Sequence, residues 1–111
     1  MITYDDFEKV DIRVGKVIKV EEFPEAINPS YILTIDFGGE IGVKKSSGQF
    51  KGAYPNMTVI EGRLVIGVVN FPPKKIGPFE SEVLTLGLSD GKGSWILVSP
   101  DQNVEIGERL K

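Results

Sequence analysis

Hydrophobic and polar residues alternate along much of the chain, and this pattern predicts short β-strands. From Ile12 to Val20 the pattern has a period of two, so one face of the expected strand carries Ile12, Val14, Ile18 and Val20 together with Lys16. Gly15 interrupts this run and is a candidate position for a bulge or bend. Tyr31–Phe37 alternates in the same way, and a glycine pair then turns the chain into a second strand, Glu40–Ser46. Two such runs joined by glycines are typical of a β-hairpin.

The second half of the chain continues with strands. Arg63–Asn70 is apolar on both faces, as expected of a central strand that is covered on both sides. Glu82–Leu88 and Trp95–Val98 are two further strand candidates, separated by the turn segment Ser89–Gly93. Short strands joined by glycine and proline turns are typical of small closed barrels. We therefore expect the all-β class, with a five-stranded OB-fold barrel, terminal extensions and a single domain over residues 1–111.

Two short helices are expected beside the strands. Thr3 followed by Asp6 resembles a capping box, which predicts a helix over Tyr4–Val10 with Phe7 and Val10 facing inward. Ser47–Tyr54 is polar and contains glycine, so it fits a short helix better than a strand.

Charge is distributed unevenly, although the formal net charge is only −3. Residues 1–40 carry four Lys or Arg and nine Asp or Glu, residues 41–79 carry six and one, and residues 80–111 carry three and six. A basic middle segment between acidic flanks can focus a positive field on one surface. The same lysines can also do no more than solvate one face. Charge alone leaves both interpretations open.

The chain has no cysteine and no histidine, which excludes several kinds of chemistry. Disulfides and thiolate sites need cysteine, and histidine is the commonest general base and transition-metal ligand. No phosphate-binding loop motif occurs, and Gly91-Lys92-Gly93 fits a hairpin turn better than a phosphate cradle. We therefore expect no enzyme activity, no metal and no cofactor.

No apolar run approaches the ~20 residues that a membrane span needs. The first residues, MITYDDFEKV, are acidic and lack the basic and apolar regions of an export signal. We therefore expect a cytoplasmic protein that does not insert into membranes.

The segment Asn70–Ser81, NFPPKKIGPFES, combines three prolines with apolar and basic side chains. Prolines hold a loop stiff, so less conformational entropy is lost when it binds. One interpretation is a loop packed against its own core, and the other is a preformed surface for an extended peptide or a single-stranded nucleic acid. OB-like barrels place their binding loops between strands one and two and between strands four and five. Here these loops are Phe23–Ser30 and Asn70–Ser81.

Three stretches resemble a known family: DFEKVDIRVGKVIKVEEFPEA, SYILTIDFGGEIGVKKSSGQF and VVNFPPKKIGPFESEVLTLG. They resemble the CsaA family of export-related chaperones, within the wider group of tRNA-binding OB-fold domains found at the end of methionyl-tRNA synthetases. The motif D-[IL]-R-V-G, here Asp11–Gly15, is shared by the whole group, whereas Lys44–Gln49 and Ser81–Leu84 resemble the CsaA branch. The resemblance implies a homodimeric OB-fold protein that binds unfolded or precursor polypeptides, assists export and is also classed as tRNA-binding.

Two short runs depart from the nucleic-acid-binding members of that group. Those members typically end the loop after strand four with S-x-G-M, whereas this chain has Ser81-Glu82-Val83-Leu84. Glu82 places an acid where a small neutral residue would meet a phosphate or base. After strand three, Lys45-Ser46-Ser47-Gly48 replaces the valine-serine-glycine-isoleucine run. Both differences weigh against tRNA affinity, while the basic pair Lys74 and Lys75 matches the group and leaves salt-dependent binding open.

Two functions from different classes follow. In a polypeptide-binding chaperone, apolar side chains contact an extended peptide and polar ones bond to its backbone; the candidates are Phe23, Tyr31, Ser46, Ser47, Gln49, Asn70, Phe71, Pro72, Pro73 and Phe79. In a tRNA-binding module, basic and small polar residues contact phosphates; the candidates are Lys44, Lys45, Lys51, Arg63, Lys74, Lys75 and Ser81. We favour the first, because a rigid apolar loop on an acidic protein suits a neutral or basic polypeptide better than RNA.

The homodimer implied by the resemblance has loose support in the chain ends. Phe7, Val10, Val104, Ile106 and Leu110 are more apolar side chains than two frayed ends need. These residues could equally cap the open ends of the barrel, so both alternatives remain.

Overall fold

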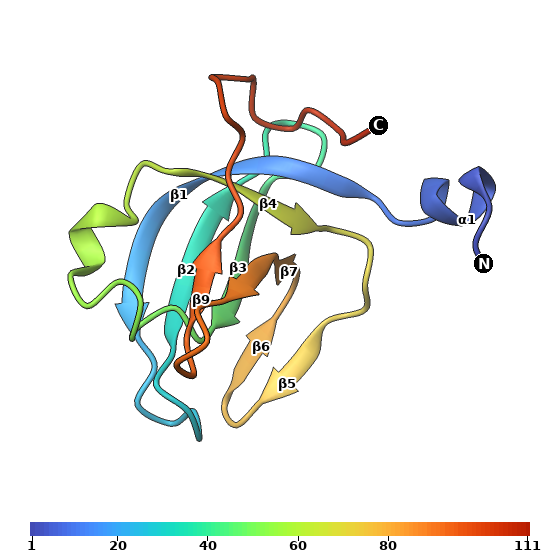
Figure 1. Ribbon diagram of the computed structural model, residues 1–111. Helices are drawn as coiled ribbons and strands as arrows, with labels where there is room; N and C mark the ends of the chain where they lie inside the picture. Colours follow the sequence, from blue (N-terminus) through green and yellow to red (C-terminus); the bar gives the residue numbers. More distant parts are fainter.

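The computed structural model describes residues 1–111, and the chain is made mostly of strands (Figure 1). In chain order the elements are α1 (Tyr4–Glu8), β1 (Ile12–Glu22), β2 (Tyr31–Asp36), β3 (Val43–Gly48), the 3-10 helix η1 (Met57–Val59), β4 (Leu64–Val68), β5 (Lys74–Ile76), β6 (Phe79–Ser81), β7 (Leu84–Thr85), β8 (Gly87–Ser89) and β9 (Trp95–Leu97). None of the helices has the length and apolar character that crossing a bilayer requires.

Five of the strands form one antiparallel sheet in the order β3-β2-β1-β4-β7. β1 joins its two halves, because Ile12–Lys16 pairs with β4 whereas Lys16–Glu22 pairs with β2. In Figure 1, β1 is the long blue strand that curves over the others. Such curling turns a sheet into a barrel. The barrel is nearly closed, which confirms the predicted all-β, OB-like fold, and the pairing of β2 with β3 confirms the predicted hairpin.

A bulge in β1 changes which of its residues face the core. The register with β2 shifts between Val17 and Lys19, so Val17 and Val20 are both buried while Ile18 is 51% exposed. The prediction that Ile18 and Val20 share one face is therefore wrong, because the extra residue of the bulge reverses the alternation between them. Gly15 has another role than the predicted bulge: a methyl group there would overlap the side chains of Ile35 and Phe37.

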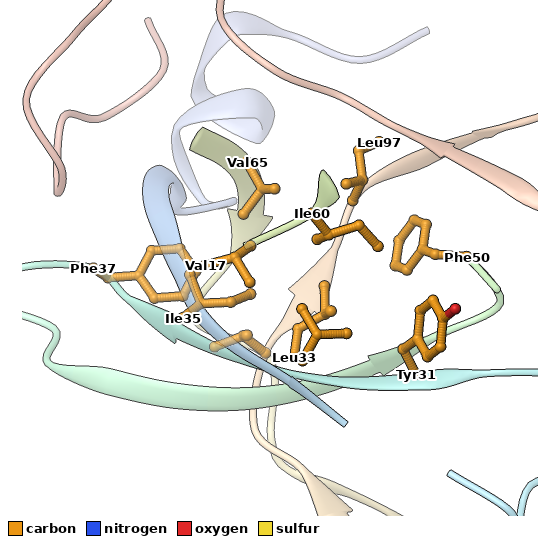
Figure 2. Packing of buried hydrophobic residues seen from close by; sticks show 11 residues of the cluster. Val17, Tyr31, Leu33, Ile35, Phe37, Phe50, Ile60, Val65 and Leu97 are labelled. Carbon is orange, nitrogen blue, oxygen red and sulfur yellow. The ribbon is translucent and has the colours of Figure 1, made fainter. Parts of the chain in front are cut away.

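The core lies inside the barrel and draws on β1, β2, β4 and β9 and on the segments that connect the strands. Figure 2 shows Leu33 and Ile35 of β2 near Val17 of β1, with Phe37 and Phe50 at opposite ends of the cluster. The whole cluster comprises Val17, Val20, Tyr31, Leu33, Ile35, Phe37, Phe50, Ile60, Val65, Val83 and Leu97. Full burial of one such aliphatic or aromatic side chain stabilises a fold by roughly 1.5 to 3 kcal/mol.

Both expected helices differ from the prediction. The capping box of Thr3 and Asp6 is present, but α1 ends at Glu8, Phe7 is only half-buried and Val10 is exposed. No helix forms over Ser47–Tyr54, because β3 continues to Gly48 and the next turn sends the Phe50 ring into the core. A methyl group on Gly48 would overlap that ring, which explains the glycine in the strand.

The predicted loop and the strand after it are also divided differently. Residues 74–81 form a small hairpin of β5 and β6 that turns at Gly77, whose φ is +59°. The expected strand Glu82–Leu88 breaks into β7 and β8, because its first part pairs with β4 and its second part pairs with β9. Leu86 lies at the change of partner, where its N–H donates to the Ile66 carbonyl. The hairpin turn over Ser89–Gly93 is confirmed.

Arg13 ties the start of β1 to the last residues of the chain. Its Nε donates to Asp11 Oδ1 at 2.6 Å, and its Nη1 donates to the Gly107 carbonyl at 3.0 Å. The side chain is only 12% exposed, and its hydrogen bond holds the pKa of the Asp11 carboxyl below its usual value. We call Asp11, Arg13 and their partners Asn70 and Gly107 the terminal clip. The D-I-R part of the family motif therefore has a structural role in this fold.

Candidate ligand-binding groove

A groove opens at the end of the barrel where the two predicted binding loops meet. The loop after β1 forms one side, the start of the β5–β6 hairpin forms another, and the ends of β3 and β6 lie between them, in the lower part of Figure 1. Its volume is about 720 Å³, within the usual range of ligand sites. The lining residues are Phe23, Ala26, Ile27, Asn28, Ser30, Ser47, Gly48, Gln49, Phe71, Pro72, Pro73, Lys74, Ile76, Ser81, Glu82, Val83, Leu84 and Trp95.

Two phenylalanines of the proline-rich segment have different surroundings. Phe79 packs edge-on against Phe23, with ring centroids 5.3 Å apart, and so holds the β5–β6 hairpin to the loop after β1. Phe71 stays 53% exposed and lines the groove together with Pro72 and Pro73. Each interpretation of this segment thus describes part of it. Phe79 packs against the protein's own loop, whereas Phe71 remains open to solvent as part of a preformed surface.

Two polar candidates, Ser47 and Gln49, line the groove, whereas Phe79 and three candidates with hydrogen-bonding side chains lie outside the lining. Tyr31 is fully buried and its hydroxyl donates to the Tyr54 carbonyl at 2.8 Å; burial raises its pKa. Ser46 is fully buried as well, and its hydroxyl accepts from Thr85 Oγ1 at 2.8 Å.

Asn70 is the third residue outside the groove. Its side-chain oxygen accepts from the Asp11 N–H at 2.9 Å, and its Nδ2 donates to the Lys9 carbonyl at 2.8 Å. It belongs to the terminal clip, whose side-chain hydrogen bonds link residues far apart in the sequence.

All but one of the basic candidates lie outside the groove lining. Of the lysines only Lys74 lines the groove, and Lys75 follows it on the opposite side of β5, paired in register with Glu80. Lys51 donates to Glu22 at 2.7 Å, which raises its pKa, and the Arg63 guanidinium lies 5.5 Å from the centre of the Tyr54 ring. Lys44 and Lys45 lie on β3, outside the groove lining.

Ser81 and Glu82 close the barrel wall beside the groove. The Glu82 N–H donates to the Lys45 carbonyl at 2.8 Å, and its carboxylate accepts from the Lys45 N–H at 2.9 Å. Ser81 Oγ accepts from the Ser47 N–H at 3.3 Å. Side chains thus replace part of a strand ladder, and we call this contact between β3 and residues 81–82 the seam. The residue that departs from the nucleic-acid-binding pattern has a structural function here.

Several lining residues were absent from the sequence-based candidates. Ile27 is fully exposed in the loop after β1, and an apolar residue in a proline-flanked polar loop was a usable signal. Trp95 reaches the groove from β9 and packs edge-on against Phe50, with centroids 5.7 Å apart. No local pattern links Trp95 to the other lining residues, because only barrel closure brings β9 beside the end of β3.

A curled five-stranded barrel with a groove between its one-two and four-five loops defines the class of OB-type binding domains. The family model described as a putative tRNA binding domain matches residues 12–109, and the chain belongs to this family. Its match to a crystal structure of the chaperone CsaA from Bacillus anthracis has a TM-score of 0.92 and 40% identity, and covers 100% of this chain and 99% of that one. The CsaA chaperone protein from Picrophilus torridus matches with a TM-score of 0.90 and 46% identity over the whole of both chains. These matches confirm the resemblance to the CsaA family.

The chain also matches a methionine–tRNA ligase from Pyrococcus furiosus, with 31% identity over 99% of this chain. It spans 14% of that ligase's length. The matched family is named for tRNA binding, and the two CsaA structures are described as chaperones; neither description refers to catalysis.

Proposed function

We propose that this protein is a molecular chaperone that binds unfolded or precursor polypeptide segments in the groove. The observation that carries the proposal is Phe71, which is 53% exposed on a proline-stiffened loop at the edge of an apolar groove. An exposed aromatic side chain on a stiff loop binds apolar segments with little loss of conformational entropy. The CsaA relatives, which are chaperones, support the same assignment.

Charge favours a polypeptide over a polyanion as the occupant of the groove. The charged lining residues are one lysine, Lys74, and one glutamate, Glu82. Their formal charges cancel, and the whole chain has a net charge of −3. Nucleic-acid sites instead gather several cations along one surface.

The test uses Phe71→Ala, with Leu88→Ala as the matched control. Both side chains are exposed, at 53% and 65%, and Leu88 lies on β8 outside the groove lining. We expect Phe71→Ala to weaken the binding of a fluorescent, reduced and carboxymethylated model protein about tenfold, while Leu88→Ala leaves it unchanged. Fluorescence anisotropy measures both. Equal affinity of the wild type and Phe71→Ala would refute this site.

We infer tRNA binding as a second candidate function, supported by the family to which residues 12–109 belong. Lys74 and Lys75 are exposed on β5 and would contact phosphates. Replacing both by Gln should reduce the slope of log K against log salt by about one unit per lost contact, while Lys92→Gln at the β8–β9 turn should not change it. Filter binding at several salt concentrations measures this slope, and an absence of binding at low salt would refute this candidate.

We also propose that the protein forms a homodimer in the cytoplasm, as a single domain over residues 1–111, and assists export there. Val104 and Leu110 are each 40% exposed near the C-terminus, so apolar surface remains for a second copy. A two-fold dimer would present two grooves and gain avidity for a long polypeptide. Light scattering at micromolar concentration tests this part, and a mass near 12.2 kDa would refute it.

A further inference from the structure

The outer edge of β3 is paired only at its two ends. Along this edge Lys45, Ser47 and Gln49 point their backbone groups away from β2, since alternate residues of a strand bond to opposite sides. Lys45 is fully paired with Glu82, and the Ser47 N–H donates to Ser81 Oγ. At the other end, the Gln49 carbonyl accepts from the Trp95 N–H at 2.9 Å and from Ser94 Oγ at 2.7 Å.

Two backbone groups between these ends have no strand partner. The Ser47 carbonyl receives only a long contact of 3.5 Å from the Ser46 hydroxyl, and the Gln49 N–H donates to no protein acceptor. Both residues line the groove, as do their neighbours Ser81 and Trp95. A carbonyl and the N–H two residues later point the same way in a strand. The wall of the groove therefore contains one acceptor and one donor side by side.

We propose that this pair, the Ser47 carbonyl and the Gln49 N–H, binds the backbone of one residue of an extended polypeptide lying in the groove. The inference rests on the proposed chaperone function and names its mode of recognition. In a segment running parallel to β3, a single residue satisfies both groups: its N–H donates to Ser47 and its carbonyl accepts from Gln49. Glu82 and Trp95 bound the gap, so the ladder cannot extend further in either direction.

This geometry selects unfolded chains by their backbone rather than by their sequence. In a folded protein most backbone N–H and carbonyl groups are already paired, so an unfolded segment offers both groups of one residue to the gap far more readily. The side chains on either side of that residue then contact apolar lining such as Phe71 and Trp95. Because Lys74 and Glu82 cancel in charge, a neutral apolar segment fits best.

The experiment uses the wild-type protein and a peptide whose backbone is altered one position at a time. The parent probe is the peptide Thr-Leu-Thr-Phe-Thr-Leu-Thr. Its N-terminus is acetylated, and its C-terminal carboxyl group is attached to a fluorophore through an amide. Six variants each carry one N-methyl group on a different peptide nitrogen after the first residue. N-methylation removes a donor without changing the side chain, and the protein stays unmutated, so folding defects cannot confuse the result.

We expect N-methylation at one nitrogen to weaken binding at least tenfold in anisotropy titrations, while the other positions change it less than about threefold. The parent peptide should also slow hydrogen exchange of the Gln49 amide at least tenfold and leave the Lys45 amide, already bonded to Glu82, unchanged.

Each contrary outcome has its own meaning. If all variants bind like the parent while Phe71→Ala still weakens binding, the backbone pairing is wrong and the proposed chaperone site stands. Equal weakening at every position also overturns the pairing, since it indicates a loss of extended conformation. If the parent fails to bind, or binds Phe71→Ala equally well, both proposals fail. Tighter binding of a single-stranded twelve-nucleotide oligouridine that displaces the peptide would assign the groove to nucleic acid and overturn the inference.

Discussion

The two sides of the barrel differ in how they are closed. On the terminal clip, Asp11 and Arg13 bring the chain ends together through a charged pair that is largely shielded from solvent and through several side-chain hydrogen bonds. On the seam, the joint between β3 and residues 81–82 uses one backbone hydrogen bond and two side-chain acceptors, and two backbone groups next to it stay unpaired.

This difference separates stability from binding. Hydrogen bonds to a nearly buried charge hold a fold together, whereas an incompletely paired strand edge beside an apolar groove is available to a ligand. The family motif around Asp11 and Arg13 therefore belongs to the part that holds the barrel, and the less regular segment around Ser47 and Glu82 belongs to the part that we propose to bind. Variants at the two sides should change different measurements.

The largest effect is expected for Arg13→Ala on the clip side. Removing the guanidinium leaves the Asp11 carboxylate with only the longer contact to Arg109 Nε, at 3.5 Å, and removes the donor to the Gly107 carbonyl, which should lower the free energy of unfolding by about 2 to 3 kcal/mol. Urea denaturation measures this, with the exposed Lys16→Ala on the same strand as control. The affinity for peptide, measured at urea concentrations well below the unfolding midpoint, should stay within twofold of the wild type. A loss of affinity without a loss of stability would mean that the clip, and not the seam, is the side that binds.

The next effect is a pH dependence of the clip. The pKa of Asp11 is lowered in the folded state, chiefly by the hydrogen bond from Arg13. A lowered folded pKa contributes stability that is complete above the unfolded value of about 4 and is lost as pH falls towards the folded pKa. Asp11→Asn should therefore be less stable at pH 7 and lose less stability between about pH 5 and pH 2. Urea midpoints over this range test it, and parallel curves for both proteins would contradict it.

A smaller effect is expected at the seam. Glu82→Ala leaves the Lys45 N–H without its acceptor and should cost about 1 kcal/mol, whereas Glu82→Gln retains an acceptor and should cost less. Because residue 82 lines the groove, Glu82→Ala should also change peptide affinity, in contrast to Arg13→Ala. Urea denaturation and anisotropy on the same two variants provide the comparison. A seam variant that loses stability but keeps its affinity would show that the seam acts like the clip.

The smallest effect is expected for Lys51→Gln. Its ion pair with Glu22 is short, at 2.7 Å, but the two side chains are 44% and 48% exposed, so water and salt screen it. We expect no resolvable change in the urea midpoint, either at low salt or at 0.5 M NaCl. A clear loss of stability that salt abolishes would mean that this surface pair stabilises the fold more than its exposure suggests.

The alternating runs were sufficient to predict the barrel but not its irregularities. β1, β2 and β4 lie close to where period-two patterns and a doubly apolar run placed them, whereas β3 (Val43–Gly48) begins and ends later than the predicted Glu40–Ser46. The bulge at Val17 to Lys19 has no local residue signature, and it lies just past Lys16, where pairing with β4 ends and pairing with β2 continues. The same limit explains why Glu82–Leu88 divides between two partner strands.

The groove was predictable in part. Phe71, Pro72 and Pro73 were identified from a local cluster of prolines and aromatics, and Phe23 from its place in the first loop. Tyr31 and Ser46 have residue types suited to binding, but burial directs their hydroxyl groups to Tyr54 and Thr85. Exposure of a polar side chain depends on neighbours distant in sequence, so residue type alone could not separate these two from Ser47 and Gln49.

The sequence by itself determined the β-rich class, the OB-like barrel, the family resemblance and the stiff apolar loop, because periodicity, proline and glycine act over a few residues. Only the tertiary structure decided which side chains are free. Closure of the barrel buried Tyr31, turned Phe79 onto Phe23, and changed Glu82 from a suspected obstacle to phosphate into a partner for Lys45. It also left the Ser47 carbonyl and the Gln49 N–H facing the groove, since the strands that pair with β3 meet it only on either side of that gap.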